Sequence, residues 1–314
     1  MAPIAIVIPV HNRREITLRC LAGLEGDGVF AWATVYVVDD GSTDGTGEAV
    51  HTRFPLATVL TGDGNLWWGG AIRLGMQTAC EHGATCLVWL NDDCLPASGT
   101  LRLLADHALR TGGLATGWAE TPSGGRYGGF RKTHQGLQAA TPPPPGGVLA
   151  CDAAGGNCVA IARPVVDAIG LPDAARLPHA LLDVDYLLTA TRAGFGLDLL
   201  GSAVCRNDDN LGAATASWLL ADASPMRQWK LFRQRQSTYG YAANLHLHRK
   251  HWGPWGLWLF ARGYLKLAAI CAVRAVVPLR WLRAAFGARS GSWRTQQFYR
   301  QANADPSPPS PVRK

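Results

Sequence analysis

The chain has 314 residues, of which 47% are hydrophobic, and a formal net charge of +7 at pH 7. This length suffices for one large domain or two modest ones. The eight cysteines form no CxxC pair and stand mostly in apolar runs, which favours reduced thiols in a cytosolic protein over disulfides or a zinc site. The first ten residues lack the features of a signal peptide, and no run of 18 uncharged apolar residues predicts a spanning helix.

Apolar runs alternate with helical patterns at the start of the chain. The runs contain few turn residues, as in strands that are buried on both faces of a parallel sheet. The predicted strands are Ile4–Val10, Thr34–Val38, Ala57–Leu60 and Cys86–Leu90, and the predicted helices are Arg14–Leu24, Thr46–Phe54 and Gly70–His82. This alternation predicts an α/β fold with a doubly wound, mostly parallel sheet.

The unusual polar clusters of this region fall at the carboxyl ends of the predicted strands. Pro9–Arg13 ends the first strand, Asp39–Asp40 the second, residues 62–65 the third and Asn91–Asp93 the fourth. Ligands of open α/β sheets bind outside these strand ends. We therefore expect the clusters to form one binding site.

Two adjacent carboxylates, Asp92 and Asp93, stand at the tip of the fourth strand. Because like charges repel, the pair is favourable only beside something positive. A divalent cation, Mg²⁺ or Mn²⁺, takes oxygen ligands and is commonly shared with substrate phosphates. The alternative is a solvated acidic turn.

The middle of the chain has a different composition. Residues 111–147 are rich in Gly, Thr and Pro, which predicts loops and edge strands, with Pro142–Pro145 as a stiff linker. Gly155 and Gly156 follow in an apolar stretch and indicate a close approach of the backbone to a ligand or strand. Asp183 opens a further predicted helix, which stops at Gly194.

The C-terminal part is basic and aromatic. If residues 252–281 form one helix, Arg262, Lys266 and Arg280 fall in a sector of about 40°, with Trp, Leu and Val around them. This pattern predicts a helix lying on an anionic membrane and argues against nucleic acid as the partner; the alternative is a core helix with solvated charges.

These shifts in composition predict three regions. Residues 1–222 form the first region, with two halves, 1–110 and 111–222. Residues 223–300 form the membrane-associating helical region. Residues 301–314, rich in Pro and Ser, form a disordered tail.

Residues 4–200 resemble the family-2 inverting glycosyltransferases, which have the A-type nucleotide-sugar fold. Six pieces carry the resemblance in the family's order: Ile6–Arg13, Val37–Thr46, Asn65–Gly75, Leu90–Asp93, Gly155–Arg163 and Leu182–Phe195. Trp67-Trp68-Gly69-Gly70 together with Asn91-Asp92-Asp93 looks most like bacterial rhamnosyl- and galactofuranosyltransferases.

The resemblance implies that residues 1–222 are a catalytic domain, with a nucleotide-binding half, 1–110, and an acceptor half, 111–222. It also implies a role for single positions. Pro9, His11 and Arg13 would line the nucleotide pocket, while Asp40, with Asp39 beside it, would accept the N3–H of a uracil or thymine ring. The alternatives are a simple turn at Asp40 and a satisfied strand-end residue at His11.

Further roles concern the sugar and the reaction. Asp93 would hold the divalent cation, and Asp183 would be the general base that takes the proton from the acceptor hydroxyl. The alternative for Asp183 is a helix cap. The remaining implied positions are Asp92, Trp68, Gly69, Gly70 and Arg73 near the donor, and Gly155 and Gly156 on the acceptor side.

Two positions depart from the family pattern. Leu182 stands where the family usually has Glu, and Arg206 falls on the position of a metal-binding His. An arginine cannot bind a metal but can hold the diphosphate directly, so the need for a cation is open.

The resemblance implies an enzyme that moves a sugar from a UDP- or dTDP-sugar to a growing, lipid-linked glycan in cell-envelope polysaccharide synthesis. We expect it on the cytoplasmic face of the cell membrane as a peripheral protein. The alternative is a catalytically silent nucleotide-sugar-binding scaffold of a polysaccharide assembly complex.

Overall fold

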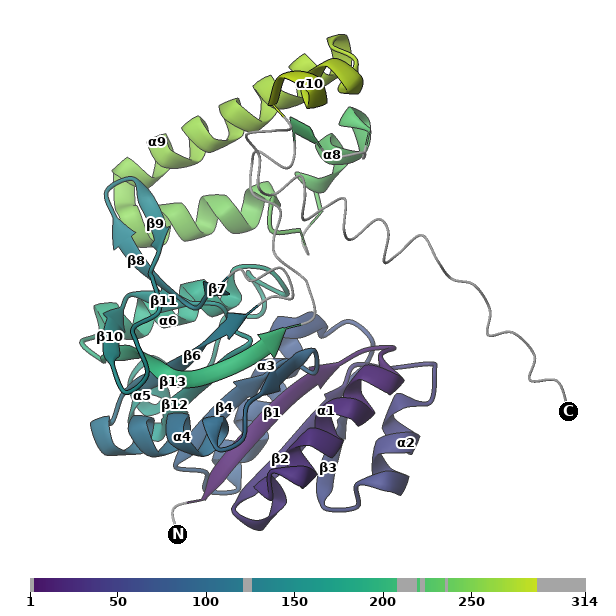
Figure 1. Ribbon diagram of the computed structural model, residues 1–314, viewed down its shortest axis with the longest axis vertical. Coiled ribbons are helices and arrows are strands. Elements are labelled where there is room, and N and C mark those ends of the chain that lie inside the picture. The colour runs from purple at the N-terminus through teal and green to yellow at the C-terminus, as the bar shows by residue number, and fades with distance from the viewer. Residues whose placement is uncertain (1–2, 121–125, 208–218, 221–223, 235–236, 287–314) are drawn as a thin grey trace, which may run out of the picture. The chain divides into compact units, whose positions relative to one another are not determined.

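The computed structural model describes all residues except 1–2, 121–125, 208–218, 221–223, 235–236 and 287–314 (Figure 1). The predicted tail, 301–314, therefore lies outside the described residues. The chain divides into two compact units. The first comprises Met1–Asn210 and Arg235–Leu259, and the second Leu211–Gln234 and Phe260–Lys314.

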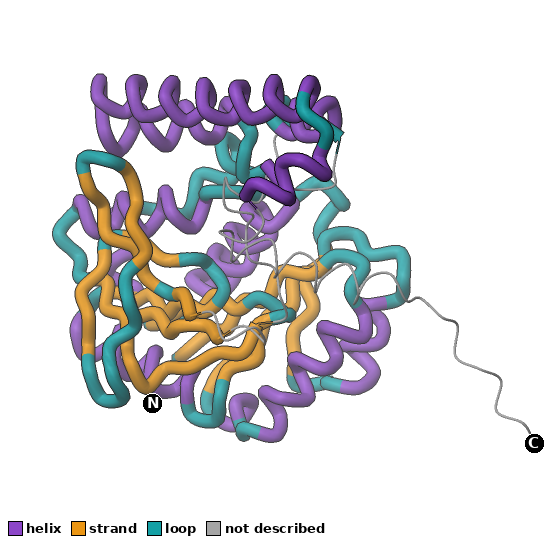
Figure 2. Tube along the Cα trace, turned by 45° about the horizontal axis from the view of Figure 1, so that its top comes forward, coloured by secondary structure: helices purple, strands orange, loops and turns teal. Residues whose placement is uncertain are grey.

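The first unit is built on a ten-stranded mixed sheet (Figure 2). Its main path runs β10-β13-β6-β12-β4-β1-β2-β3, while β5 pairs with β13 and β7 with β6. The strands are β1 (Ile4–Val10), β2 (Ala33–Asp39), β3 (Ala57–Thr61), β4 (Cys86–Leu90), β5 (Cys94–Pro96), β6 (Leu114–Glu120), β7 (Arg126–Tyr127), β10 (Val148–Cys151), β12 (Cys158–Ala162) and β13 (Leu197–Asn207). A second sheet, in the order β11-β8-β9, contains β8 (Gly129–Thr133), β9 (Gly136–Ala139) and β11 (Ala153–Ala154).

The predicted fold class is confirmed. Strands β3, β2, β1 and β4 are parallel neighbours, and β12 joins β4 in the antiparallel sense. One prediction needs correction, because β6 is not an edge strand: it lies between β12 and β13. The glycine in its sequence favoured an edge strand, although the strand is in the interior of the sheet.

Helices cover both faces of the sheet, because successive strand residues point to opposite sides. Ile4, Ile6 and Ile8 of β1 pack in one core with α1, α2 and α4, whereas Ala5 and Val7 pack in the other with α3, α5 and α6. The helices are α1 (Arg14–Gly26), η1 (Val29–Ala31), α2 (Thr46–Arg53), α3 (Trp67–Glu81), α4 (Thr100–Thr111), α5 (Arg163–Ile169) and α6 (Leu182–Arg192). The two cores fix the strand ends at one edge, where the site forms.

Helix α9 (Tyr241–Val276) begins in the first unit and continues into the second. It bends at Gly253, whose φ of 58° and ψ of −138° are not helical, next to Pro254. Among the described residues it is the one helix that is long and apolar enough to cross a membrane by length and composition. The sequence alone did not predict such a helix.

The second unit contains α8 (Pro225–Leu231), the end of α9 and α10 (Leu279–Phe286). Phe232 packs against Tyr264, and Arg283 donates a hydrogen bond to the carbonyl of Leu220. Pro278 separates α9 from α10. The expectation of one helix through residue 281 is therefore wrong, and Arg280 does not share a helix with Arg262 and Lys266.

Candidate active site

A cavity of about 310 Å³ opens where β1 and β2 end and α3 begins. The first turn of α3, the segment after β1 and a loop before α6 form its walls. Its lining residues are Pro9, Val10, His11, Arg13, Asp40, Gly64, Trp67, Trp68, Ala71 and His179. Pro9, His11, Arg13, Asp40 and Trp68 are thus brought together from three separate motifs.

Asp40 is buried beneath the loop that leads into α3. Its carboxylate accepts the backbone N–H groups of Gly64 at 2.9 Å, Leu66 at 3.1 Å and Trp67 at 2.8 Å. A carboxylate has about four acceptor positions, so three of them serve to hold this loop. The Asp40 carbonyl in turn lies 2.7 Å from Nδ1 of His11. Asp40 therefore shapes the cavity wall.

Asp39 serves a similar local purpose. Its Oδ1 accepts the backbone N–H of Ser42 at 2.9 Å, which closes the turn after β2. The same turn is tied to the end of β1, because Ser42 accepts the backbone N–H of Asn12 at 2.8 Å. Two strand ends are thereby held side by side.

Arg13 supplies the positive charge beside the paired carboxylates. Its Nη2 lies 2.9 Å from Asp93 Oδ2, and its Nε lies 3.4 Å from Asp92 Oδ2. Asp92 also accepts the hydroxyl of Thr17 at 3.0 Å. Burial is the main reason that the pKa of Asp92 is raised from 3.8 to about 6, although Arg13 acts to lower it.

The carboxylates beside the cavity could bind a divalent cation only if other molecules supplied further ligands. Asp93 offers hard carboxylate oxygens, which suit Mg²⁺ or Mn²⁺. Within the described part of the chain there is no cluster of three His, Cys, Asp or Glu side chains that could hold a metal ion. An ion at Asp93 would need its other ligands from a bound diphosphate and from water.

Asp183 stands in the first turn of α6. Its Oδ2 accepts the backbone N–H of Gly156 at 2.7 Å, and its Oδ1 accepts that of Val184 at 2.8 Å. Burial raises the pKa of this carboxyl, while the two N–H donors act to lower it. The helix begins at Leu182, one residue earlier than the sequence predicts, so Asp183 is not its N-cap.

Trp68 lies near Gly156, which binds Asp183, and is hydrogen-bonded to the segment Asn91–Asp93. A side chain on Gly156 would meet the Trp68 ring at 2.7 Å, so this residue must be small for the ring to approach Asp183. Trp68 Nε1 donates to Asn91 Oδ1 at 2.7 Å, and Asn91 Nδ2 donates to Asn157 Oδ1 at 2.9 Å. The indole therefore links the cavity wall to the strand that ends in Asp92 and Asp93.

Three non-glycine residues have positive φ among the described residues, and all three flank this site. They are Asn12 with 52°, Trp67 with 56° and Leu181 with 69°. Such backbone costs on the order of 1 kcal/mol or more per residue and is concentrated at functional sites. Trp67 turns the chain into α3, and Leu181 turns it into α6.

The other predicted positions are not in the cavity lining, and these include Asp39, Asp92, Asp93, Gly156 and Asp183 described above. Gly69 is packed too tightly for a side chain, since a Cβ would lie 2.7 Å from the Leu177 carbonyl oxygen. Gly70 follows it on α3, and Arg73 donates to the Pro172 carbonyl at 2.9 Å. Gly155 has open space around it, and Arg206 lies on β13 opposite Leu95 of β5.

The departure at Leu182 has a packing explanation. Leu182 is fully buried and clusters with Leu177 and with Ala243 of α9, and Trp68 packs against the cluster. A glutamate would place a charge in this apolar contact at high cost. Leu182 therefore packs α6 against α9.

Sequence reasoning missed several residues of the site. His179 lines the cavity and contacts the edge of Trp67, and burial lowers its pKa. Asn157 completes the Trp68–Asn91 chain. Asn157 lies within Gly155–Arg163, but no role was predicted for it; His179 belongs to none of the six motifs, and Pro178 beside it is a local signal of a turn.

A comparison with protein families assigns part of the chain to a family. Residues 5–152 match the family described as Glycosyl transferase family 2. The matched residues form a family-2 glycosyltransferase domain. The match includes every predicted position from Pro9 to Asp93, and it ends before Gly155, Gly156, Asp183 and Arg206.

Solved structures show the glycosyltransferase A-type fold. The mannosyltransferase PcManGT from Pyrobaculum calidifontis, in complex with GDP-Man and Mn²⁺, aligns with a TM-score of 0.51 and 19% identity over 94% of this chain and 83% of its own. GalNAc-T7 with UDP, GalNAc and Mn²⁺ aligns with a TM-score of 0.56 and 14% identity over 99% of this chain, which spans 60% of that protein. Comparison with curated proteins gives no match.

Proposed function

We propose that this glycosyltransferase is an inverting enzyme that transfers a sugar from a UDP- or dTDP-sugar to a growing, lipid-linked glycan. The observation that carries the proposal is the position of Asp183. Its carboxylate is held by two backbone N–H groups. A Cβ on Gly156 would lie 2.7 Å from the Trp68 ring and 3.0 Å from Asp183 Cβ, and the Trp68 ring lines the cavity at the strand ends. A carboxylate beside a donor cavity is the arrangement that a general base needs.

The cavity suits a nucleotide in size and lining. It is about 310 Å³ in volume, and it combines the aromatic surfaces of Trp67 and Trp68 with polar groups of His11, Arg13 and Asp40. Asp40 has about one acceptor position left for an N–H of a pyrimidine ring. The two solved structures contain GDP-Man in one case and UDP in the other.

In the proposed reaction Asp183 takes the proton of the acceptor hydroxyl as its oxygen attacks the anomeric carbon. The bond from that carbon to the diphosphate breaks, and the configuration inverts in one displacement. Arg13, which pairs with Asp93 at 2.9 Å, supplies positive charge near the leaving group. A divalent cation bound by Asp93 and the diphosphate would neutralise further charge on the leaving nucleotide.

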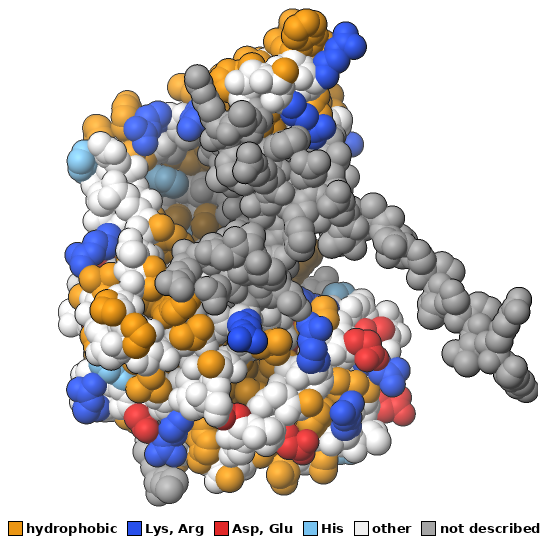
Figure 3. Space-filling view, in the orientation of Figure 1, with side chains coloured by type: hydrophobic (Ala, Val, Ile, Leu, Met, Phe, Trp, Pro, Cys, Tyr) orange, Lys and Arg blue, Asp and Glu red, His pale blue; other side chains and the backbone are white. Residues whose placement is uncertain are grey.

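The proposed membrane contact rests on exposed aromatic side chains. Trp255 and Trp258 of α9 stack with ring centroids 4.6 Å apart and are both nearly half exposed. In the second unit, hydrophobic side chains gather beside Lys and Arg over α10 and the end of α9 (Figure 3). The exposed Trp pair of the first unit and, separately, the hydrophobic and basic side chains of the second each favour a peripheral site on an anionic membrane.

A thermal-shift screen tests the donor site. The purified full chain is measured against UDP, dTDP, GDP and their sugars, each with and without Mn²⁺, and nucleotide release is then followed for every sugar that binds. We expect a shift with a UDP- or dTDP-sugar, increased by Mn²⁺, followed by turnover when a polyprenyl-linked acceptor is added. No shift with any nucleotide would reject the proposal.

The alternative is a scaffold that binds nucleotide sugars without turnover. Leu182 and Arg206, which depart from the family pattern, favour it. It predicts a thermal shift with a nucleotide sugar but no release of nucleotide with any acceptor. The two functions therefore differ in the second stage of the same experiment.

A further inference from the structure

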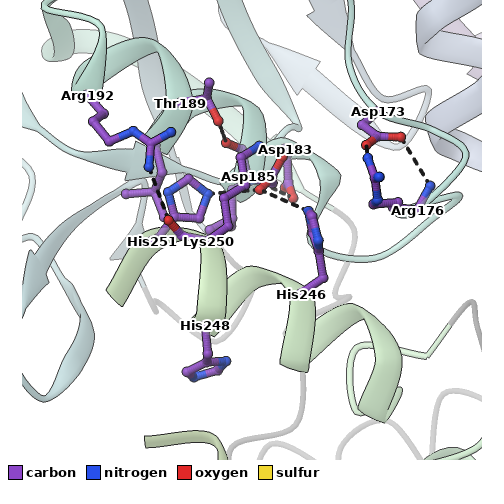
Figure 4. Close-up of polar contacts among 12 residues, drawn as sticks. Asp173, Arg176, Asp183, Asp185, Thr189, Arg192, His246, His248, Lys250 and His251 are labelled. Atoms are coloured by element: carbon purple, nitrogen blue, oxygen red, sulfur yellow. Dashed lines mark hydrogen bonds and ion pairs between the residues drawn. The ribbon is translucent and has the colours of Figure 1, made fainter. Parts of the chain in front are cut away.

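Asp185 is a buried carboxylate that the proposed reaction does not use. It stands on α6 two residues after Asp183, and side chains two residues apart point to different sides of a helix. Asp183 reaches the backbone of Gly156, whereas Asp185 faces the first part of α9 (Figure 4). The two acidic residues therefore hold α6 from different directions.

Two side chains of α9, the Lys250 ammonium and the His251 imidazole, bind the Asp185 carboxylate. Lys250 Nζ lies 2.6 Å from Oδ2, and His251 Nε2 lies 2.8 Å from Oδ1, 65 and 66 residues further along the chain. His246 Nε2 is buried 3.9 Å from Oδ1. Burial acts to raise the pKa of Asp185, but the hydrogen bonds from His251 and Lys250 outweigh it and the pKa is lowered. The carboxylate is thus charged, and each of its two oxygens has a partner.

A second contact ties the other end of α6 to the same place. Arg192, in the last turn of α6, donates to the backbone carbonyl of Lys250 at 3.1 Å. Lys250 therefore contacts α6 through its side chain near the start and through its carbonyl near the end. This arrangement fixes the helix along its length.

Leu182, packed with Leu177 and Ala243, and the hydrogen bond from Gly156 to Asp183 also hold the start of α6, but within the described residues its ion pairs are those of Asp185. Leu181, with a φ of 69°, gives no side-chain cap to the helix. Asp183 and Asp185 lie in the first turn, so a small rotation or shift of that turn moves both carboxylates together. The position of Asp183 then depends on what holds Asp185.

We propose that Lys250 and His251 are positioning residues, which hold Asp185 and through it keep the Asp183 carboxylate in place at the Gly156 backbone, next to the cavity-lining Trp68. This inference rests on the proposed function, in which Asp183 is the base. It makes α9, which lies outside the family match, a part of the catalytic apparatus. A displacement of a reacting group by about 1 Å can cost on the order of 100-fold in rate.

The test compares three variants of the full chain. Lys250→Met removes the cation, Lys250→Arg keeps a cation that can reach the carboxylate, and Arg249→Met removes the exposed charge of the neighbouring residue on the same helix. kcat and KM are measured with the donor sugar that gives turnover in the thermal-shift screen. Binding of UDP or dTDP is measured on the same samples.

For Lys250→Met we expect kcat to fall about 10- to 100-fold, with the donor KM within about twofold of the unchanged chain. Lys250→Arg should recover most of kcat, and Arg249→Met should keep it. A kcat for Lys250→Met equal to that of the Arg249→Met control would overturn the inference, even if its melting temperature fell.

Hydrogen exchange provides a readout that does not need turnover. In Lys250→Met, amides of α6 should exchange faster, while those of β1 and β4 stay protected. Unchanged exchange of α6 would overturn the inference. If the wild-type chain binds no donor sugar, the proposed function fails by itself, and this measurement still tests whether Lys250 holds α6. If Lys250→Met does not fold, His251→Gln replaces it, with His248→Gln as control, because His248 points away from Asp185 (Figure 4).

Discussion

The two walls of the site are held by different kinds of contact. On the nucleotide side, Asp39 and Asp40 accept backbone N–H groups from residues 3 to 27 positions away. On the side of α6, Asp185 depends on side chains 65 and 66 positions away. The contacts of the first wall therefore all lie within residues 39–67. The second exists only when distant helices have packed.

This difference matters for how each wall tolerates change. A carboxylate that binds backbone N–H groups keeps its partners whatever the neighbouring side chains are. A carboxylate that binds Lys250 and His251 loses one of its partners when either residue on that other helix is replaced. Four changes test the contrast, from the largest expected effect to the smallest.

The first change removes the proposed base. Asp183→Asn keeps the size of the side chain but cannot take a proton, so we expect kcat to fall by ~10² to 10⁴ with little change in donor binding. Because burial raises the pKa of Asp183, the kcat of the unchanged enzyme should rise with pH through a value above the ordinary carboxyl range. Unchanged transfer in Asp183→Asn would remove the catalytic role.

The second change tests the nucleotide wall. Asp40→Ala leaves the N–H groups of Gly64, Leu66 and Trp67 without their acceptor, and we expect the free energy of unfolding to fall by about 3 kcal/mol. The thermal shift with UDP or dTDP should disappear as well. Asp63→Ala is the control, because exposed Asp63 accepts one backbone N–H, that of Asn65. Equal losses in both variants would contradict the role of Asp40.

The third change concerns the carboxylate beneath Arg13. The pKa of Asp92 is about 6 in the folded chain against an ordinary 3.8, so the folded state binds this proton more tightly than the unfolded one. Stability should therefore fall as pH rises from about 4 to above 6, by at most roughly 3 kcal/mol.

In Asp92→Asn this contribution to the pH dependence should vanish. Denaturant unfolding at several pH values measures it, with Asp106→Asn on the exposed face of α4 as the control. A pH dependence identical to that of the unchanged chain would show that Asp92 does not titrate in this range.

The smallest expected effect is at the proposed membrane contact. Trp255→Ala with Trp258→Ala removes a stacked, exposed aromatic pair, and we expect several-fold weaker binding to vesicles that contain anionic lipid. Flotation measures the bound fraction. Leu56→Ala is the control, since Leu56 is apolar and 71% exposed at a distance in sequence from the basic region. Equal flotation of all three proteins would reject this surface.

The sequence by itself determined the sheet and the place of the site. Apolar runs such as Ile4–Val10 and Cys86–Leu90 are strands as predicted, because burial on both faces leaves a continuous local pattern. Polar residues at the ends of such strands, among them His11, Asp40 and Asp93, then have to meet at one edge of the sheet.

Only the tertiary structure decided what these residues contact. Three contacts join separate parts of the chain: the pairing of Arg13 with Asp93, the hydrogen bonds of Asp40 to the loop before α3, and the packing of Leu182 against Ala243. The hydrogen bonds of Lys250 and His251 to Asp185 join residues 65 and 66 positions apart and are an example that no local pattern predicts. A local pattern records which face of an element is buried, but the identity of a partner depends on how whole elements pack, and that information is spread over the entire chain.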